Sequence, residues 1–256
     1  MAKLIDLSKE IKYNPNDPFY MKIKIKHKPH KKSLLLIKNY LGLPKKLLGD
    51  FKGWADDKIL SMGVHAATHI DAPWHYYPTT NGKPAKTIDQ MPLEYGYADA
   101  VVIDLRHKKD LEMLYLDELK EIIDKNNLNI QPGTIVLFRT GMDKYLGTKE
   151  YPEHGIGISA EVTQWLITEK GVKVMGVDQW GFDLPLKYMV KLAKEKNDPN
   201  FFWQAHRVGK YYEYYHMEQL VNLDKLPLQG FKVIVFPLKI VGASAAPARV
   251  VAIVEE

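Results

Sequence analysis

Short apolar runs rich in β-branched residues predict the strands of this chain. In its middle they lie at residues 99–105, 133–139 and 172–177, where they indicate buried strands. Similar runs near the two ends predict further strands at residues 3–7, 231–238 and 249–254. We therefore expect a sheet built from both ends and the centre of the sequence.

Helical spacing of apolar residues appears between the central strands. Leu119, Ile122 and Ile123 predict a helix over residues 116–126. Ser159 is a suitable N-cap for a second helix through Lys170, with Gly171 as its end and with Val162, Trp165 and Leu166 facing inward. Because helices and strands alternate in the middle, we predict an α/β fold with a mixed sheet, forming a single domain over residues 1–256.

Residues 14–56 follow neither pattern. They are rich in lysine and proline, with one possible helix at 33–41. At positions 22–28 lysines alternate with Ile23, Ile25 and His27, as in a strand with one face in water. We expect this segment to be an arm or a subunit-contact element.

Composition narrows the class of protein. The chain has 256 residues, of which 46% are hydrophobic and 26% charged, as in a globular protein with a substantial core. No apolar run reaches the roughly 18 residues of a membrane span, and the first residues do not resemble a secretory signal. The sequence has no cysteine, which excludes disulfides and thiolate ligands and favours a cytoplasmic location.

The net charge of +5 is unevenly distributed, since residues 1–60 carry fourteen lysines against six acidic residues. Such a stretch can indicate a nucleic-acid or membrane partner. Here the alternating lysines are more typical of a solvated strand face, and lysines on an edge strand also discourage aggregation. We therefore expect no nucleic-acid and no membrane partner.

The strongest chemical signal is the segment from His65 to His75. It places His65, His69, Asp71 and His75 at odd positions, so that an extended or turning segment would present them on one face. Pro73 argues against a continuous helix. Imidazole and carboxylate groups hold ions such as Zn²⁺ and Mn²⁺, and the segment predicts a metal site.

A second polar cluster lies downstream, between Trp203 and Glu218. From spacing alone, four of its side chains are candidate ligands, and each could equally be a surface or packed polar residue: His206, Glu213, His216 and Glu218.

The segment from His65 to His75 resembles the signature H-x-G-T-H-x-D-x-P-x-H of the cyclase family of metal-dependent hydrolases, which includes kynurenine formamidase and isatin hydrolase. It departs from the signature only at Ala67, where the family has glycine. The family also carries a histidine and, twelve residues later, a glutamate ahead of an Asn-Leu pair. His206 and Glu218 have this spacing, and residues 222–223 are Asn-Leu. The likeness runs over residues 58–254.

The resemblance implies a swivelling β/β/α fold, a homodimer or homotetramer, and one or two Zn²⁺ or Mn²⁺ ions. It assigns one ion to His65, His69 and Asp71, and a second to Asp71 with the residues His75, His206 and Glu218. Glycine in the signature can adopt a positive φ, which alanine adopts only at a cost, so Ala67 is expected to strain the loop.

These observations predict an enzyme that hydrolyses an amide-type C–N bond in a small molecule, such as an aryl formamide, a cyclic amide or an imide. His75 is the expected general base, and Glu218 is expected to orient a histidine or bridge two ions. Trp74, Trp180 and Trp203, with the nearby residues 201–202, suggest an aromatic pocket. The alternatives are a metal-dependent cyclase, dehydratase or lactone hydrolase, or a silent metal-binding homologue.

Overall fold

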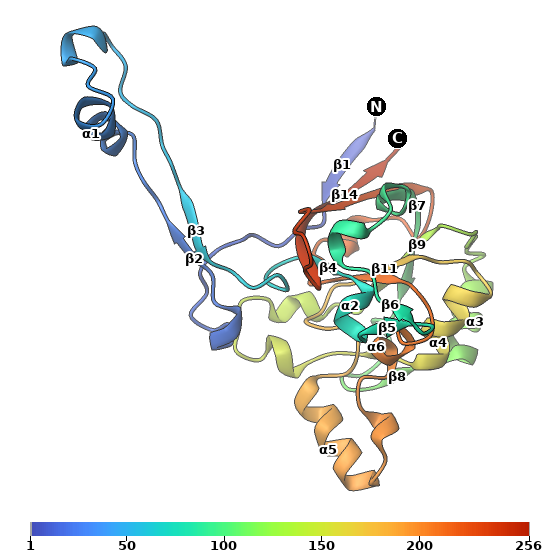
Figure 1. Cartoon of the computed structure of the whole chain (residues 1–256). Helices are drawn as coiled ribbons and strands as arrows, with labels where there is room; N and C mark the ends of the chain where they lie inside the picture. The colour runs from blue at the N-terminus through green and yellow to red at the C-terminus, as the bar shows by residue number, and fades with distance from the viewer. Residues whose placement is uncertain (1, 256) are drawn as a thin grey trace.

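The computed structural model describes residues 2–255. Its centre is a mixed sheet in the strand order β1-β14-β13-β7-β9-β11-β12-β4. In that order the strands span Lys3–Asp6, Ala245–Val254, Phe231–Pro237, Tyr97–Asp104, Ile135–Arg139, Val174–Val177, Tyr215–Glu218 and His69–Asp71. β4 also pairs with β14, so the sheet closes on itself like a barrel, with β1 added at the outer edge of β14 (Figure 1).

The pairing confirms the predicted mixed sheet. β7, β9, β11 and β12 run parallel to one another, whereas all pairings that involve β1, β4, β13 or β14 are antiparallel. Because successive side chains of a strand point to opposite faces, β9 contributes to two cores. Ile135 and Leu137 pack inside the closed sheet, and Val136 and Phe138 pack outside it.

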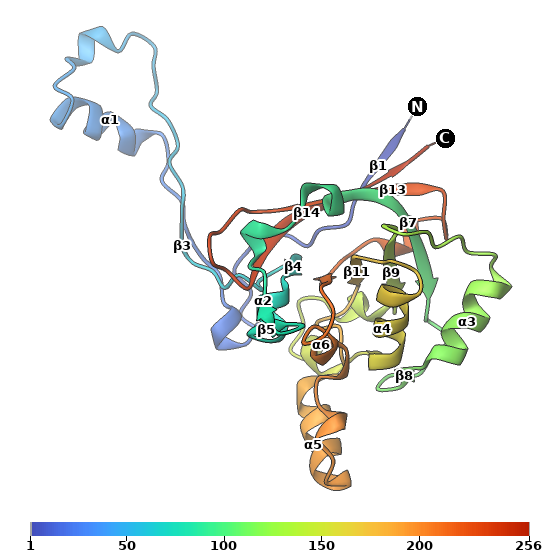
Figure 2. The same ribbon diagram turned by 45° about the vertical axis from the view of Figure 1, so that its right-hand side comes forward.

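Two helices cover the outer face. These are α3 (Leu116–Lys125) and α4 (Ala160–Thr168), which lie beside β7 and β9 in Figure 2. They bury Leu119, Val162 and Leu166 completely against the sheet. Ser159 caps α4 as predicted, because its side chain accepts a hydrogen bond from the backbone N–H of Val162 at 3.3 Å.

The predicted elements are confirmed to within a few residues, with some differences in detail. Gly171 follows α4 with φ +67°, the left-handed conformation that ends many helices. Trp165 is only half-buried rather than fully inward. The last strand starts at Ala245, earlier than predicted.

Other elements were not predicted from the sequence. They include β12, α2 (Pro73–Tyr76), α5 (Leu186–Lys196) and α6 (Gln204–Val208), together with the short strands β5 (Thr79–Thr80), β6 (Lys83–Pro84), β8 (Met113–Leu114) and β10 (Gly157–Ile158). Short 3₁₀ turns lie at Ile88–Gln90, Leu93–Gly96, Met142–Tyr145, Tyr151–Glu153, Pro199–Phe201 and Leu223–Lys225. No helix within residues 2–255 combines the length and the apolar character that crossing a bilayer requires.

The lysine-rich segment forms an arm that projects from the sheet (Figures 1 and 2). It begins at the 3₁₀ turn Phe19–Met21, continues through β2 (Lys24–Lys26) and α1 (Lys31–Asn39), passes the turn Lys45–Leu47 and returns through β3 (Lys58–Ser61). β2 and β3 pair in antiparallel fashion, so the predicted strand and helix both form. The arm exposes several large apolar side chains, among them Leu35, Leu41 and Leu47, each more than half accessible.

Candidate metal centre

Two neighbouring strands bring four of the polar side chains together. In the register of β4 and β12, Asp71 is opposite His216, and His69 is opposite Glu218. The residues between them, Ile70 and Met217, point into the closed sheet. Because side chains alternate along a strand, the four polar groups point together to the outer face, toward α2 and α6.

The remaining candidates come from short elements around these strands. His65 precedes β4, His75 lies on α2, and His206 lies on α6. As expected, no continuous helix runs through residues 65–75, because α2 begins only at Pro73. Proline is tolerated there, since the first helical N–H has no partner within the helix.

Asp71 lies at the centre of the cluster. Its Oδ1 is 2.7 Å from Nδ1 of His65 and 3.3 Å from Nε2 of His69. Its Oδ2 is 3.8 Å from Nε2 of His75. Ligand atoms of His65, Asp71 and His75 lie within 4.8 Å of one another, so they form one group that could hold an ion. His65 and His75 are partly exposed, so this outer group is open toward solvent.

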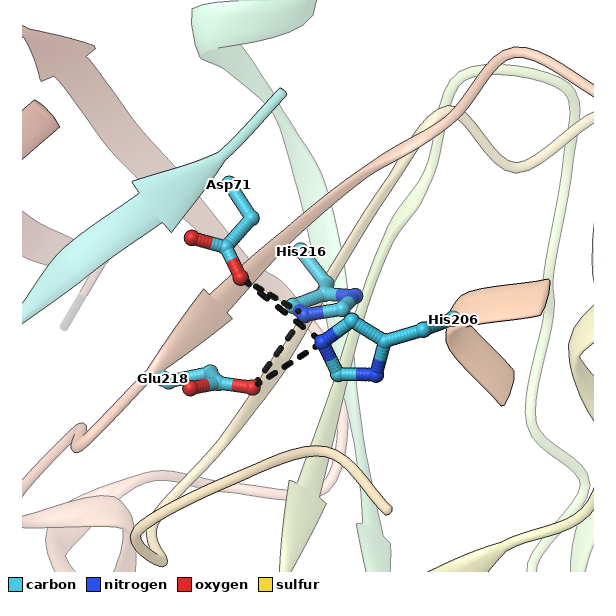
Figure 3. A group of neighbouring side chains, drawn as sticks. All are labelled: Asp71, His206, His216 and Glu218. Carbon is cyan, nitrogen blue, oxygen red and sulfur yellow. Dashed lines mark ion pairs between the residues drawn. The ribbon is translucent and has the colours of Figure 1, made fainter. Parts of the chain in front are cut away.

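A second, deeper group shares the same carboxylate. Oδ2 of Asp71 is 3.2 Å from Nε2 of His216 and 3.9 Å from Nε2 of His206, and Oε1 of Glu218 lies at the same two distances from these nitrogens. Figure 3 shows the two imidazoles facing the two carboxylates. All four residues are buried, and their ligand atoms lie within 4.8 Å of one another.

Several of these buried atoms lack an aligned hydrogen-bond partner within residues 2–255. They are Nε2 of His69, both carboxylate oxygens of Asp71 and Nε2 of His216. Leaving such groups buried and unsatisfied is costly, and native structures rarely do so unless an ion or water completes the set. Nitrogen and oxygen donors that converge in this way fit a divalent cation such as Zn²⁺ or Mn²⁺.

The imidazoles are held in place by partners on their other nitrogens. His69 donates from Nδ1 to the carbonyl oxygen of Ala67 at 2.9 Å, and His206 donates from Nδ1 to Oδ2 of Asp183 at 2.6 Å. Trp203 stacks on His206 with 4.4 Å between the ring centroids. Metal-binding histidines are commonly oriented in this way. Asp183 was missed by the sequence analysis because no motif or spacing distinguished it.

Charge interactions shift the pKa values of the cluster. Burial disfavours protonation of His69, but Asp71 and Glu218 outweigh burial and raise its pKa to about 10. The same carboxylates overcome burial at His216 and raise its pKa to about 9. The imidazoles in turn hold the pKa values of both carboxyls well below their usual range, against the effect of burial. The two ionised carboxylates therefore attract positive charge to this site.

His75 differs from His69 and His216 in that its pKa is lowered rather than raised. Burial, opposed by Asp71 and reinforced by His206 and His65, lowers its pKa to about 4. Its ring is therefore unprotonated near neutral pH in the metal-free protein.

Ala67 has the predicted strained conformation. Its φ of +60° lies in the left-handed region, and its side chain is buried. Because the carbonyl oxygen of Ala67 orients His69, this conformation is part of the site. An alanine thus adopts the backbone conformation that glycine adopts easily.

A cavity of about 300 Å³ opens onto the cluster. His65, His75, His206 and Glu218 line one part of it, and apolar side chains line most of the rest, among them Tyr20, Trp180, Phe182, Leu184, Met189 and Trp203. The predicted aromatic pocket is confirmed for Trp180 and Trp203. Trp74 lies on the surface, 45% exposed, and Phe201 lines a different pocket.

Glu213, a candidate ligand from spacing, and Asp178 both lie outside the ligand groups. Glu213 pairs with Lys86 at 2.9 Å, away from the ligand groups. Asp178 accepts hydrogen bonds from the backbone of Thr140 and Gly141 and from the Thr140 hydroxyl, so it stabilises the turn after β9.

The chain is similar to several known proteins. The model of the Cyclase family matches residues 5–184 of the chain. The isatin hydrolase of Roseibium aggregatum is 26% identical over 219 residues, which cover 80% of this chain and 76% of that protein. The kynurenine formamidase of Bacillus cereus is 26% identical over 197 residues, which cover 75% of this chain and 77% of that protein.

Among solved structures, isatin hydrolase A from Ralstonia solanacearum superposes with a TM-score of 0.75 at 27% identity, over 99% of this chain and 92% of that chain. The shared architecture confirms the fold that the sequence resemblance implied.

Proposed function

We propose, since the chain belongs to the Cyclase family, that it is a metal-dependent hydrolase that cleaves an amide-type C–N bond in a small molecule. The observation that carries this proposal is the convergence of buried, unpartnered ligand atoms on Asp71 at the end of a largely apolar cavity. The names of its relatives, isatin hydrolase and kynurenine formamidase, support a carbon–nitrogen bond outside peptides as the target.

One or two ions, Zn²⁺ or Mn²⁺, would be held by the predicted residues. The resemblance assigns His65, His69 and Asp71 to one ion, and Asp71 with His75, His206 and Glu218 to the other. In the structure the ligand atoms of His75 lie instead with those of His65 and Asp71. When bound, a divalent ion supplies a Lewis acid that polarises the acyl oxygen and lowers the pKa of a water molecule.

The side chains then carry out the proton transfers. His75 lines the cavity beside His65, with 4.2 Å between their ring centroids, and we assign it the role of general base when its ring is not bound to an ion. It accepts a proton from water as the new C–O bond forms, and it returns that proton to the amide nitrogen as the C–N bond breaks. The products are a carboxylic acid and an amine, so atoms and charge balance.

Glu218 is a positioning residue in this scheme, and as a ligand it could bridge two ions. Its Oε1 accepts a hydrogen bond from the backbone N–H of Phe182 at 2.8 Å, which fixes the carboxylate opposite His69 and His216. A carboxylate held in this way keeps the surrounding imidazoles in one orientation.

The cavity favours a small, ring-bearing substrate. Its volume of about 300 Å³ is at the lower end of known ligand sites. Trp180 and Trp203 offer flat apolar walls that exclude water and pack against an aromatic ring. We therefore propose N-acyl arylamines, cyclic amides and cyclic imides as the substrate class.

The test combines elemental analysis with a hydrolysis screen. The purified protein is assayed for bound metal and then for turnover of N-formyl arylamines, isatin, cyclic imides and lactones in ¹⁸O-labelled water. We expect one labelled oxygen in the carboxylic acid formed from each compound, loss of activity with chelator, and recovery with Zn²⁺ or Mn²⁺. Turnover without incorporation of label would instead indicate a cyclase or dehydratase. An occupied site without turnover of any compound would indicate a silent homologue.

We also propose that the arm contacts a second copy of the chain, in a homodimer or homotetramer. Support comes from its exposed leucines, Leu35, Leu41 and Leu47, which are 61%, 62% and 63% accessible in the single chain. Exposed apolar groups gathered on one projecting segment are typical of an interface. The lack of cysteine is consistent with our proposal that the protein resides in the cytoplasm.

Light scattering on purified protein tests this contact. The double variant Leu41→Asp, Leu47→Asp should lower the measured mass toward that of one chain. Lys45→Asp, on the same turn, serves as the control for added negative charge. A single-chain mass for the unaltered protein would contradict the proposal.

A further inference from the structure

His216 lies deeper in the site than any other histidine, and the family resemblance gave it no role. Its strand, β12, places it directly opposite Asp71 on β4. Its Nε2 is 3.2 Å from a carboxylate oxygen of Asp71 and 3.2 Å from one of Glu218. The side chain is fully buried, so water cannot replace these neighbours.

The other nitrogen of this ring has a partner that sets its tautomer. The Tyr76 hydroxyl lies 3.2 Å from Nδ1 of His216 and 3.2 Å from the backbone oxygen of Asp71. A hydroxyl has one proton, and the carbonyl oxygen can only accept it. The Tyr76 oxygen is therefore free to accept a hydrogen bond from Nδ1–H of His216, which leaves Nε2, facing the two carboxylates, as the nitrogen that exchanges its proton for an ion.

The same arrangement recurs at two of the predicted ligands. His69 and His206 also donate from Nδ1, to the Ala67 carbonyl and to Asp183, and also turn Nε2 toward Asp71 and Glu218. Histidines that bind metals through one nitrogen usually donate a hydrogen bond from the other. His216 is thus oriented in the same way as the ligands implied by the resemblance.

Packing holds the His216 ring in this orientation. Phe182 stacks on one face with 4.5 Å between centroids and an interplanar angle of 8°, and Tyr76 stacks on it at 5.0 Å and 27°. Stacking against two aromatic side chains restrains the rotation that would turn Nε2 away from the carboxylates. Apart from those carboxylates, Nε2 has no aligned partner within the described residues.

We propose that His216 is an additional metal ligand, which completes a buried set of two imidazoles and two carboxylates with His206, Asp71 and Glu218. This inference rests on the proposed function, because it concerns the ion that the hydrolase would use. The deep set is more enclosed than the outer group of His65, Asp71 and His75. The deep set therefore binds the more tightly held ion.

The test compares His216→Leu with Met217→Leu. Leucine fills a volume similar to that of histidine in an aromatic surrounding, and Met217 is the next residue of β12 but points into the closed sheet, so it controls for local disturbance. Metal affinity is measured by competition with a chelator, and the Co²⁺-loaded proteins are compared by visible absorption. His216→Leu should weaken the tightest ion by more than about 100-fold, beyond the 10–100-fold expected for a residue that only orients a ligand. It should also change the Co²⁺ spectrum, whereas Met217→Leu should alter neither.

Unchanged affinity and an unchanged spectrum in His216→Leu would overturn the inference. If that variant does not fold, Co²⁺-loaded wild-type protein is examined by NMR for strongly shifted imidazole N–H signals. One such signal should move in Tyr76→Phe, because Tyr76 contacts Nδ1 of His216. Absence of a responding signal would also overturn it.

The outcomes separate this inference from the proposed function. An active wild-type enzyme whose His216→Leu variant binds metal as tightly contradicts the ligand role alone. A wild-type protein that binds an ion through His216 but hydrolyses nothing contradicts the proposed function alone. A wild-type protein that binds no divalent ion contradicts both.

Discussion

Asp71 and His216 are paired residues of two antiparallel strands, and Oδ2 of Asp71 lies 3.2 Å from Nε2 of His216. The two residues come from distant parts of the chain and meet only because β4 inserts between β12 and β14. A shift of β4 by one residue would turn Asp71 into the closed sheet, away from His216. The metal centre therefore depends on the register of this strand pair.

His69→Ala should abolish tight metal binding and hydrolysis together. His69 is fully buried, and its Nε2 faces both Asp71 and Glu218. Without this imidazole the two buried carboxylates lose a positively charged neighbour, and an ion loses a ligand. Metal content by elemental analysis and turnover under saturating substrate check this result. Full activity in demetallated His69→Ala protein would contradict the metal mechanism.

His75→Ala should keep at least one ion but lose most of the turnover. Loss of a general base typically slows a reaction by about 10²–10⁴-fold. The partly exposed position of His75 at the cavity wall means that the deep ligand group remains intact. Metal content and the pH profile of kcat are measured together, with His107→Ala as the control for an exposed histidine paired with Glu118. An unchanged rate and pH profile would show that another group is the base.

Ala67→Gly should change the free energy of unfolding by less than about 1 kcal/mol. Glycine adopts the left-handed conformation without strain, which should stabilise the folded protein by about 1–2 kcal/mol. This gain is offset because one buried methyl group is lost and because glycine has the higher chain entropy in the unfolded state. Ala67→Val should instead be strongly destabilised, because a β-branched residue at φ +60° is a conformational outlier. Urea unfolding of the metal-loaded proteins measures both. Equal stability of the valine and glycine variants would contradict the assigned backbone strain.

Metal-free protein should lose stability as the pH rises from about 7 to about 10. Both His69 and His216 have folded-state pKa values, about 10 and about 9, above the ordinary value of 6.5. The folded state therefore binds more protons than the unfolded state between these values. The stabilisation is complete below pH 6.5 and disappears as the pH passes the folded pKa values.

The metal-loaded protein provides the comparison for this pH effect. The ion takes the place of the protons on the two histidines. The metal-loaded protein should therefore not lose stability as the pH rises over this range. Thermal unfolding of chelator-treated and metal-loaded protein across pH 6.5–10 measures the difference. Parallel curves for the two forms would contradict the expected exchange of protons for metal.

The elements with strong periodic patterns were predictable. The strands β7, β9 and β11 and the helices α3 and α4 combine apolar spacing with clear ends, such as the Ser159 cap. β12 was not predicted as a strand, and β4 was predicted only as part of an extended or turning segment. Both are short and carry polar residues at alternate positions where the site lies. α6 was missed because it has only five residues and follows Trp203 in a left-handed conformation.

The sequence by itself determined the chemical nature of the site. The spacing of His65, His69, Asp71 and His75 predicted metal ligands, and the interval from His206 to Glu218 identified the second half by resemblance. These signals are local, because residue type and short spacing are properties of the chain alone.

Only the tertiary structure decided which further residues join the site. Asp183 orients His206, and His216 faces Asp71, through contacts that span large intervals of sequence. Spacing alone could not show which of two downstream candidates, His216 or Glu213, belongs to the metal site. Strand pairing places the first beside Asp71, and Glu213 instead pairs with Lys86. The reason is physical: side-chain proximity across a closed sheet depends on strand order and register, which packing of the whole core sets.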